Sequence, residues 1–487
     1  MTRRHRHSQN PLAGSGGIEL RHTGRIHSGR ALALVVLQLH DQTGRFVTDL
    51  LAELDSEHAL SRQERSRAVD VVAGTLRRRR TIDILLRSQV RRPRADVEPD
   101  LWRILQTGVQ QLCFGRTPDY AAVDATVELT RAVDRPEWSG FANGVLRTAA
   151  RLLTDQFSTE PARNRVPVDG GLYRSLNTDI FSCPLTAPMD YFGEAFSLPR
   201  AIARRWHHQM SLTDLWTAGF HSLNVPATGM RVNRLRATVS DVVGSLEAAG
   251  FVTEPGMMDE SLRLTSAGRV KMLPGYTCGH WTIQDESAML ATHLLNPAPG
   301  ELILDLCAAP GGKTTHLAEI SGDRASIHAT DVSEQRLQLV RENVSRLGLS
   351  SVELRVIERD GSGLPELDFD AALVDVPCSN TGVLSRRPEA RWRFRESDLQ
   401  ELTQLQTRLL MTAYDRLRPG GRLVYSTCSI EPEETNELIR NVAQAVPSMK
   451  LQKEQVTLPG QPADGAYAAL LIHEDGSLPG DQPGPAF

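Results

Sequence analysis

From about residue 276 onward, the sequence alternates between short apolar runs and segments of helical periodicity. The apolar runs are LILDLCA, ASIHATD, VELRVIER, DAALVDV and GRLVYSTCS. Between most of them lie helical segments such as SEQRLQLVRENVSRLG and LTQLQTRLLMTAYDRL. Short apolar runs are typical of strands buried on both faces, and their alternation with helices is typical of a doubly wound, mostly parallel sheet. The pattern therefore predicts an α/β domain of Rossmann-like architecture over residues 276–474.

The rest of the chain predicts a multidomain protein. Residues 28–155 carry apolar side chains at i, i+3 and i+4 spacing, which predicts an all-α domain. Residues 156–195 contain Pro, Gly and Ser with weak periodicity, and we interpret them as a linker. Residues 196–275 mix helical with short extended segments, which indicates a small α+β module. The polar segments 1–27 and 475–487 are predicted to be disordered tails.

The cysteines and the hydropathy of the chain indicate the cellular compartment in which we expect the protein. The six cysteines include no C-x-x-C pair, so we expect no zinc site and no other metal. Free thiols in a reducing cytoplasm fit these scattered cysteines. No run of about eighteen apolar residues is present, so we expect no membrane span. The N-terminus MTRRHRHSQNPLAGSGG lacks the apolar core of a signal peptide, which favours a cytoplasmic protein.

Arginine clusters are the one charge feature that bears on nucleic acid. The net charge of −4 carries no such information, but Arg77–Arg80 and the group Arg91, Arg92 and Arg94 are locally basic. Such clusters can neutralise phosphates. They can equally be a solvated helix face, and the cluster alone favours neither interpretation.

A glycine-containing turn follows the first apolar run, within LDLCAAPGGKTTHLAE. The end of a first parallel strand, a tight turn and a helix start form the place where open α/β sheets bind nucleotide-like ligands. The segment is neither a P-loop nor a G-x-G-x-x-G fingerprint. The candidate cofactor-binding residues of this turn are Cys307, Ala308, Ala309, Pro310, Gly311, Gly312 and Lys313.

Acidic residues follow the next two predicted strands. Asp331 stands at the end of the second strand, where a carboxylate can accept both ribose hydroxyls of a nucleoside. Asp360, in RDGSG, is predicted to end the third strand and to meet the adenine edge. A glycine turn with acids at two successive strand ends indicates S-adenosylmethionine as the cofactor.

Two cysteines follow the fourth and fifth predicted strands. Cys378 lies in LVDVPCSNTG, three residues after Asp375, and Cys428 lies in YSTCS. A single cysteine at such a place is most often a packing residue. Two cysteines past neighbouring strand ends on the ligand side favour a functional pair. Their residue types alone leave open which of them is a nucleophile.

Four motifs here resemble those of one enzyme family. LDLCAAPGGKTTHL, VDVPCSNTGVL, RRPEARW and YSTCSIEPEE resemble the motifs of the RsmB and sun family of RNA cytosine-5 methyltransferases. The segments LQTGVQQLCFGRTPDYAAVDATVEL and FANGVLR resemble the NusB-like RNA-binding domain that precedes the catalytic domain in part of that family. The resemblance covers roughly residues 28–472.

The resemblance implies a fold, a cofactor and roles for individual residues. It implies a NusB-like all-α domain, a small α+β RNA-binding module and a methyltransferase domain that binds S-adenosylmethionine through the turn at 307–313, Asp331, Asp360 and Asp375. It makes Cys428 the nucleophile that attacks C6 of cytosine and Cys378 the residue that assists product release. Asp375 would contact the N3 and amino edge of the base.

The implied substrate is 16S rRNA, methylated at C5 of a cytosine during rRNA processing. A tRNA enzyme of the same family is the first alternative. A non-enzymatic NusB-like RNA-binding factor is the second, although such a factor would be expected to lose a cysteine or the glycine turn. A DNA methyltransferase is disfavoured because it would need neither Cys428 nor a NusB-like domain. We expect a monomer with no membrane partner.

Overall fold

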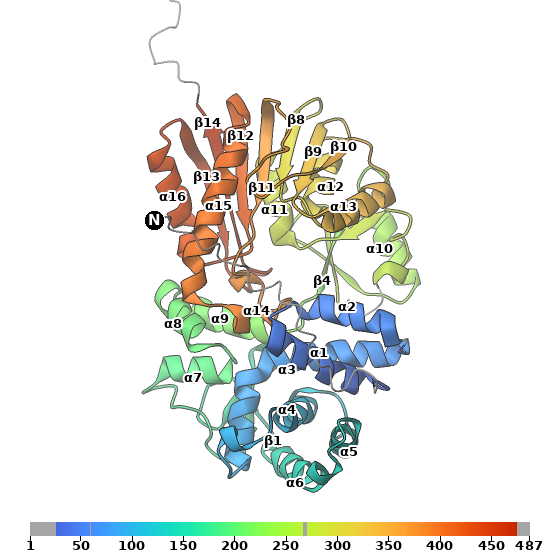
Figure 1. Cartoon of the computed structure of the whole chain (residues 1–487), viewed down its shortest axis with the longest axis vertical. Helices are drawn as coiled ribbons and strands as arrows, with labels where there is room; N and C mark the ends of the chain where they lie inside the picture. Colours follow the sequence, from blue (N-terminus) through green and yellow to red (C-terminus); the bar gives the residue numbers. More distant parts are fainter. Residues whose placement is uncertain (1–25, 59, 266–269, 475–487) are drawn as a thin grey trace, which may run out of the picture. The chain divides into compact units, whose positions relative to one another are not determined.

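The computed structural model describes residues 26–58, 60–265 and 270–474. The chain divides into two compact units, residues 1–153 and 154–487 (Figure 1). The predicted disordered tails fall almost wholly outside the described residues, at 1–25 and 475–487. Across the ranges that are described, we find no helix long and apolar enough to span a bilayer.

The first unit is helical, as predicted. Its α-helices are α1 (Gly29–Thr43), α2 (Val47–His58), α3 (Arg62–Gln89), α4 (Pro99–Phe114), α5 (Asp119–Ala132) and α6 (Ser139–Ala150). Ser28 and Ser61 cap α1 and α3, because each side chain accepts a hydrogen bond from a first-turn amide. Pro99 occupies the first turn of α4, where no backbone donor is needed. The all-α prediction for this part of the chain is confirmed.

Part of the basic stretch of α3 packs within the helical unit. Arg78 is buried, and its guanidinium lies 4.4 Å from the centre of the Phe114 ring. Arg79 pairs with Asp41 at 2.5 Å. The hypothesis that this stretch neutralises RNA phosphates is therefore wrong for Arg78, because its side chain packs against Phe114 of the same unit.

The segment 156–195 is structured, which corrects the interpretation of it as a linker. It contributes to a three-stranded sheet of order β1-β3-β2, with β1 at Leu153–Ser158, β2 at Arg165–Pro167 and β3 at Tyr173–Leu176. Helices α7 (Pro188–Ala195), α8 (Arg200–Gln209) and α9 (Leu212–Leu223) follow. Aromatic rings pack between these elements, including Phe192 of α7 and Trp216 of α9 at 5.5 Å between centres. Periodicity misses such a segment because its strands are short and its core is aromatic.

The predicted α+β module is present and includes one strand from beyond residue 275. Its antiparallel sheet has the order β5-β6-β4-β7. The strands are β4 (Thr228–Val232), β5 (Thr253–Pro255), β6 (Ser261–Leu264) and β7 (Trp281–Ile283), with α10 (Val239–Ala248) after β4. Trp281 is fully buried in the core of this sheet, together with Met230 and Leu262.

A seven-stranded sheet of order β10-β9-β8-β11-β12-β14-β13 forms the C-terminal part of the chain. Its strands are β8 (Leu302–Leu306), β9 (Ser326–Asp331), β10 (Val352–Val356), β11 (Phe369–Asp375), β12 (Leu417–Thr427), β13 (Met449–Thr457) and β14 (Ala466–His473). The first five strands pair in parallel, whereas β14 runs antiparallel to β12 and β13. The mostly parallel, doubly wound prediction is confirmed.

Helices cover both faces of this sheet (Figure 1). They are α11 (Glu286–Leu295), α12 (Gly312–Ile320), α13 (Glu334–Leu347), α15 (Leu399–Tyr414) and α16 (Asn436–Ala445), with the short α14 (Ala390–Arg393) before α15. Leu373 of β11 shares a core with α11 and α12, and its neighbour Val374 shares a core with α15 and α16. The chain leaves β8 toward β9 on one side, and β11 lies on the other. Such a reversal opens a crevice at the carboxyl ends of the strands.

Candidate active site

The turn between β8 and α12 is shaped by backbone that favours glycine. Gly311 has a φ of 97°, and a Cβ there would lie 2.9 Å from Cγ1 of Val340 in α13. A side chain at this position would therefore collide with α13. Arg336 of α13 donates to the carbonyl oxygen of Ala309 at 2.8 Å and holds the turn from the same side. The turn at 307–313 thus lies fixed at the carboxyl end of β8, with α12 beginning at Gly312.

Asp331 is the last residue of β9 and is buried. Its Oδ1 accepts a hydrogen bond from the Ser333 amide at 3.1 Å. Its Oδ2 lies 3.0 Å from Nη1 of Arg336, yet none of the described residues gives it a well-directed hydrogen bond. This buried oxygen can therefore accept a hydrogen bond from a ligand hydroxyl.

Asp360 lies beyond the third strand, not at its end. β10 ends at Val356, and Val356 pairs with Asp331 in the register of the sheet. Asp360 follows in an exposed turn, where its Oδ1 accepts from the Ser362 amide at 2.9 Å. The prediction of its place in the strand was wrong, because the strand loses its pairing partner after Val356. Asp360 still comes after the carboxyl end of β10, which is the same edge of the sheet at which Asp331 ends β9.

Asp305, the next-to-last residue of β8, is a buried carboxyl group that the sequence analysis missed. Thr314 of α12 donates to its Oδ2 at 2.6 Å. Burial, with the neighbouring charges of Asp375 and Asp331, raises the pKa of Asp305 to about 7. An acid inside the otherwise apolar run LILDL was the available signal. The floor of the crevice therefore holds a carboxyl group that titrates near neutral pH.

The two cysteines meet beyond the ends of β11 and β12. Sγ of Cys378 lies 3.1 Å from Sγ of Cys428, and both thiols are free. Asn380 holds the turn between them in a left-handed conformation with a φ of 61°. Its side chain donates to the carbonyl oxygen of Cys378 at 2.8 Å, and its Oδ1 lies 3.4 Å from Cys428 Sγ. The sequence placed both cysteines on one edge, and the structure brings them into contact.

The thiol pair shares its protons. A hydrogen bond from Cys428 lowers the pKa of Cys378. The same contact, followed by burial, raises the pKa of Cys428. The two groups therefore titrate as one unit. Within that unit Cys378 is the sulfur that ionises first, and the remaining proton stays with Cys428.

Asp375 lies between the turn and the cysteines. Its Oδ2 pairs with Nζ of Lys313 at 2.7 Å, and Ser426 of β12 donates to its Oδ1 at 3.1 Å. Although burial opposes it, the Asp375 carboxylate raises the pKa of Lys313, so the ammonium persists. The predicted residues 313 and 375 are thus directly linked. Asp375 keeps 38% of its side chain exposed and so remains accessible to a substrate.

Glu434 is a fully buried carboxylate that joins the two cysteine segments. Its Oε1 accepts from the Ser379 amide at 2.9 Å and from Gln406 at 2.8 Å. Its Oε2 accepts from Ser429 at 2.5 Å and also from the Ser379 hydroxyl. Ser379 follows Cys378 and Ser429 follows Cys428 in the chain. Glu434 therefore fixes the neighbours of both thiols, a role that the sequence analysis did not assign.

These groups form one site along one edge of the sheet. Buried acids and a glycine turn lie at the ends of β8 and β9, which suits a ligand with ribose hydroxyls and a positive charge. A thiol pair lies at the ends of β11 and β12, which suits nucleophilic attack on an electrophilic carbon. The arrangement supports transfer of a group from a nucleoside-containing donor to a substrate activated by a thiol.

Comparisons with known families identify two matching regions. The family described as 16S rRNA methyltransferase RsmB/F matches residues 292–475, and the NusB family matches residues 27–151. The chain is 33% identical over 459 residues to the ribosomal RNA small subunit methyltransferase B of Salmonella enteritidis PT4, covering 91% of this chain and 98% of that protein. The protein of the same name from Salmonella typhi gives the same identity and coverage.

Solved structures share the fold. The crystal structure of PH0851 matches with a TM-score of 0.71 at 23% identity, covering 92% of this chain and 98% of that chain. A methyltransferase homolog protein from Pyrococcus horikoshii matches with a TM-score of 0.53 at 28% identity, covering 59% of this chain and 99% of that chain.

Proposed function

The chain belongs to the family described as 16S rRNA methyltransferase RsmB/F, and on that premise we propose that it methylates C5 of a cytosine in 16S rRNA. The observation that carries the proposal is the contact between Cys378 and Cys428, whose sulfurs lie 3.1 Å apart. Methylation at C5 requires a nucleophile on C6, and thiolate is the side chain that both adds and leaves readily. A second thiol beside the first supplies a group that can assist departure.

The turn at 307–313 and the acids around it fit S-adenosylmethionine as the methyl donor. Asp331 Oδ2 is buried without a well-directed hydrogen bond from the described residues, as a ribose hydroxyl acceptor should be. The partly exposed Asp375 carboxylate suits a sulfonium cation. The turn at 307–313 would hold the amino acid portion, and Asp360 would lie toward the adenine. When bound, this cofactor supplies a methyl group on a positively charged sulfur.

Cys428 and Cys378 divide the covalent chemistry. Cys428 attacks C6, the new S–C bond forms as the C5–C6 double bond opens, and C5 becomes nucleophilic. C5 accepts the methyl group and then loses its proton to a base. The electrons of that C–H bond restore the C5–C6 double bond and expel Cys428 as thiolate. Cys378, in contact with the leaving sulfur, assists this release.

Asp375 and Lys313 act on the base and on its developing charge. The exposed part of Asp375 can accept a hydrogen bond from the cytosine amino group and orient the N3 edge. The Lys313 ammonium, 2.7 Å from that carboxylate, pairs with Asp375 and fixes its position. The cytosine must leave its stack to reach these groups, so unpaired or easily opened rRNA is the fitting substrate.

RNA binding is assigned to the parts of the chain outside the catalytic domain. We assign it to the NusB-like domain at 28–155 and the α+β module at 196–275. The match of the NusB family to residues 27–151 supports the first assignment. A reaction on rRNA also fits a cytoplasmic protein.

Methyl transfer to purified RNA tests this function. The chain is incubated with labelled S-adenosylmethionine and either 16S rRNA or total tRNA, and bisulfite sequencing locates the methylated base. We expect 5-methylcytosine in 16S rRNA, none in tRNA, and no transfer by the Cys428→Ala variant. Transfer to tRNA in place of rRNA would contradict the substrate, and methylation at another atom would contradict the mechanism.

A further inference from the structure

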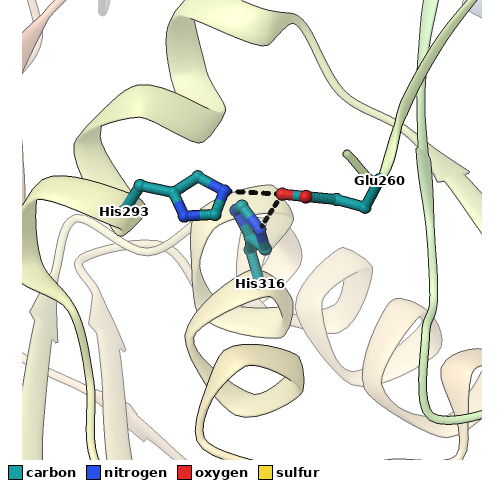
Figure 2. Close-up of side chains that lie close together, drawn as sticks. All are labelled: Glu260, His293 and His316. Carbon is teal, nitrogen blue, oxygen red and sulfur yellow. Dashed lines mark hydrogen bonds and ion pairs between the residues drawn. The ribbon is translucent and has the colours of Figure 1, made fainter. Parts of the chain in front are cut away.

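Three side chains far apart in the sequence converge on one point away from the thiol pair. Glu260 precedes β6 of the α+β module, His293 lies in α11 and His316 lies in α12. Figure 2 shows both imidazole rings directed at the same carboxylate oxygen. Oε1 of Glu260 lies 2.6 Å from Nε2 of His293 and 3.2 Å from Nε2 of His316. We refer to these residues as the Glu260 cluster.

The hydrogen bonds around His316 leave a lone pair facing the carboxylate. Thr292 donates its single hydroxyl hydrogen to the carbonyl oxygen of Met289 at 2.7 Å. In contact with Nδ1 of His316, the same hydroxyl oxygen then acts as acceptor, which places the ring proton on Nδ1. Nε2 consequently presents a lone pair toward Oε1 of Glu260. Two acceptors that face each other at this distance are both satisfied by a proton or by a metal ion between them.

A metal ion can take the place of a proton between such groups, because imidazole and carboxylate bind metals in their deprotonated forms.

We propose that Glu260, His293 and His316 bind a divalent transition-metal ion, with zinc as the occupant that fits the donor set. Two imidazole nitrogens and one carboxylate oxygen, with water in the fourth position, form a known zinc coordination set. The three candidate donor atoms all lie within 4.8 Å of one another. Nδ1–H of His316 donates to the Thr292 hydroxyl and so fixes the orientation of the ring, as the outer hydrogen-bond partners of metal-bound histidines do.

Entry of an ion into the cluster, and the small movement needed to coordinate it, both depend on His293. Its side chain is 41% exposed, whereas those of Glu260 and His316 are 10% and 2% exposed. Donors about 2.0–2.2 Å from a tetrahedral ion stand roughly 3.4 Å apart. His293 must therefore move away from Glu260 by somewhat less than about 1 Å, which its exposed ring allows. The ring planes lie at 84° to each other, so the two nitrogens approach from different directions.

The position of the cluster assigns the ion a structural role. Glu260 belongs to the loop before β6, and His316 belongs to the helix that begins at Gly312 in the cofactor turn. A bound ion would join the α+β module to that helix. Metal binding should therefore raise the thermal stability of this unit.

Zinc binding by full-length protein tests the proposal. The thiol pair is the obvious competing zinc site, so all measurements use the Cys378→Ser/Cys428→Ser background. Zinc is titrated against a chromophoric chelator, and cobalt is added in a separate experiment. We expect one ion per chain, and a visible cobalt spectrum without the near-ultraviolet band of thiolate ligation.

Variants of the cluster decide the outcome. Loss of an outer-shell partner costs about 10- to 100-fold in metal affinity, so His293→Ala should cost at least about 10-fold. Glu260→Gln should weaken zinc in the same direction, and His208→Ala, on an exposed part of α8, should leave it unchanged. Absence of a bound ion, or an affinity unaffected by both cluster variants, would overturn the proposal and leave the cluster as a hydrogen-bonded group.

Discussion

The pKa of Asp305 differs between the folded and the unfolded chain. In the unfolded chain it loses its proton near pH 4, whereas in the folded chain it keeps the proton to higher pH. Its raised pKa of about 7 arises from burial and from the charges of Asp375 and Asp331. When the pKa of an acid is higher in the folded chain, its contribution to stability is fully present at pH values below its pKa in the unfolded chain. That stabilisation is lost as the pH rises through the folded pKa. The window for this loss runs from about pH 4 to about pH 7.

Asp305→Asn should remove that titration. The amide keeps an acceptor for Thr314 but carries no charge, so the variant should gain stability relative to the natural chain as the pH rises. The gain is at most about 4 kcal/mol, from about three pKa units at 1.36 kcal/mol each. Thermal unfolding of both proteins at about pH 5 and about pH 8 measures it. A difference in melting temperature that does not change with pH would contradict the raised pKa.

Asp331 should determine cofactor affinity. Removing a charge-assisted hydrogen bond costs about 1.5–3 kcal/mol, or roughly 10- to 150-fold in affinity. Asp331→Ala should therefore weaken S-adenosylmethionine binding by that factor in calorimetry. Asp368→Ala, at an exposed aspartate outside the proposed site, is the matched control and should leave the affinity unchanged. Equal affinity in the Asp331 variant and the natural chain would place the ribose elsewhere.

The sequence predicted those site residues that lie at or just after the end of a recognisable strand. The turn at 307–313, Asp331, Cys378 and Cys428 each follow or end an apolar run that the structure confirms as a strand. Glu434 was not predictable, because its partners come from the segment after β11, from α15 and from the segment after β12, and they meet only in the folded chain. The Glu260 cluster was missed for the same reason, and its spacing resembles no metal motif.

At the scale of elements, α3 shows how a charged sequence can be buried. Arg78 lies over Phe114 and is 5% exposed, although its sequence RRRR suggested either a phosphate-binding or a solvated surface. The long aliphatic stem and planar head of arginine pack against aromatic rings, so burial of this side chain adds contact area. Composition alone cannot distinguish these environments, because the partner ring belongs to another helix.

Arg78→Ala should destabilise the helical unit and leave RNA affinity unchanged. Loss of a buried cation–π contact and of its packing should cost about 1–3 kcal/mol in the free energy of unfolding. The comparison is Arg91→Ala, an exposed residue whose loss should cost less than about 0.5 kcal/mol. Thermal unfolding of the full chain and the salt dependence of RNA binding measure the two effects. A reduced salt slope in the Arg78 variant without loss of stability would restore the phosphate-binding hypothesis.

The sequence predicted some strands well and others poorly. The buried parallel strands β8, β9, β11 and β12 were evident as apolar runs. β1, β2 and β3 were not, because strands of three to six residues give too few positions for a period. The antiparallel strand β13 exposes most of its residues and carries a weak apolar signal.

For the whole molecule, the family comparison and the site geometry agree. The chain covers 98% of a methyltransferase from Salmonella enteritidis PT4 at 33% identity, and it carries a helical unit, an α+β module and a methyltransferase sheet in that order. The sequence predicted this architecture because each part has its own periodicity. The residues between the first two parts were harder to predict, because aromatic packing rather than periodicity forms them.

The proposed covalent step is the central claim for the whole molecule, because it assigns a separate role to each thiol. If Cys428 attacks C6 and Cys378 assists release, each variant interrupts a different stage. Cys428→Ala cannot form the adduct. Cys378→Ala forms the adduct and methylates the base but cannot release it. Cys278→Ala, at an exposed cysteine, is the matched control and should behave as the natural chain does.

The decisive measurement is denaturing gel electrophoresis of each variant after incubation with 16S rRNA and S-adenosylmethionine. The account predicts a protein–RNA complex that survives denaturation with Cys378→Ala, and none with Cys428→Ala or with the double variant. A complex with Cys428→Ala and none with Cys378→Ala would make Cys378 the nucleophile and contradict the assignment. Undiminished methylation by both single variants would remove the thiol pair from the mechanism altogether.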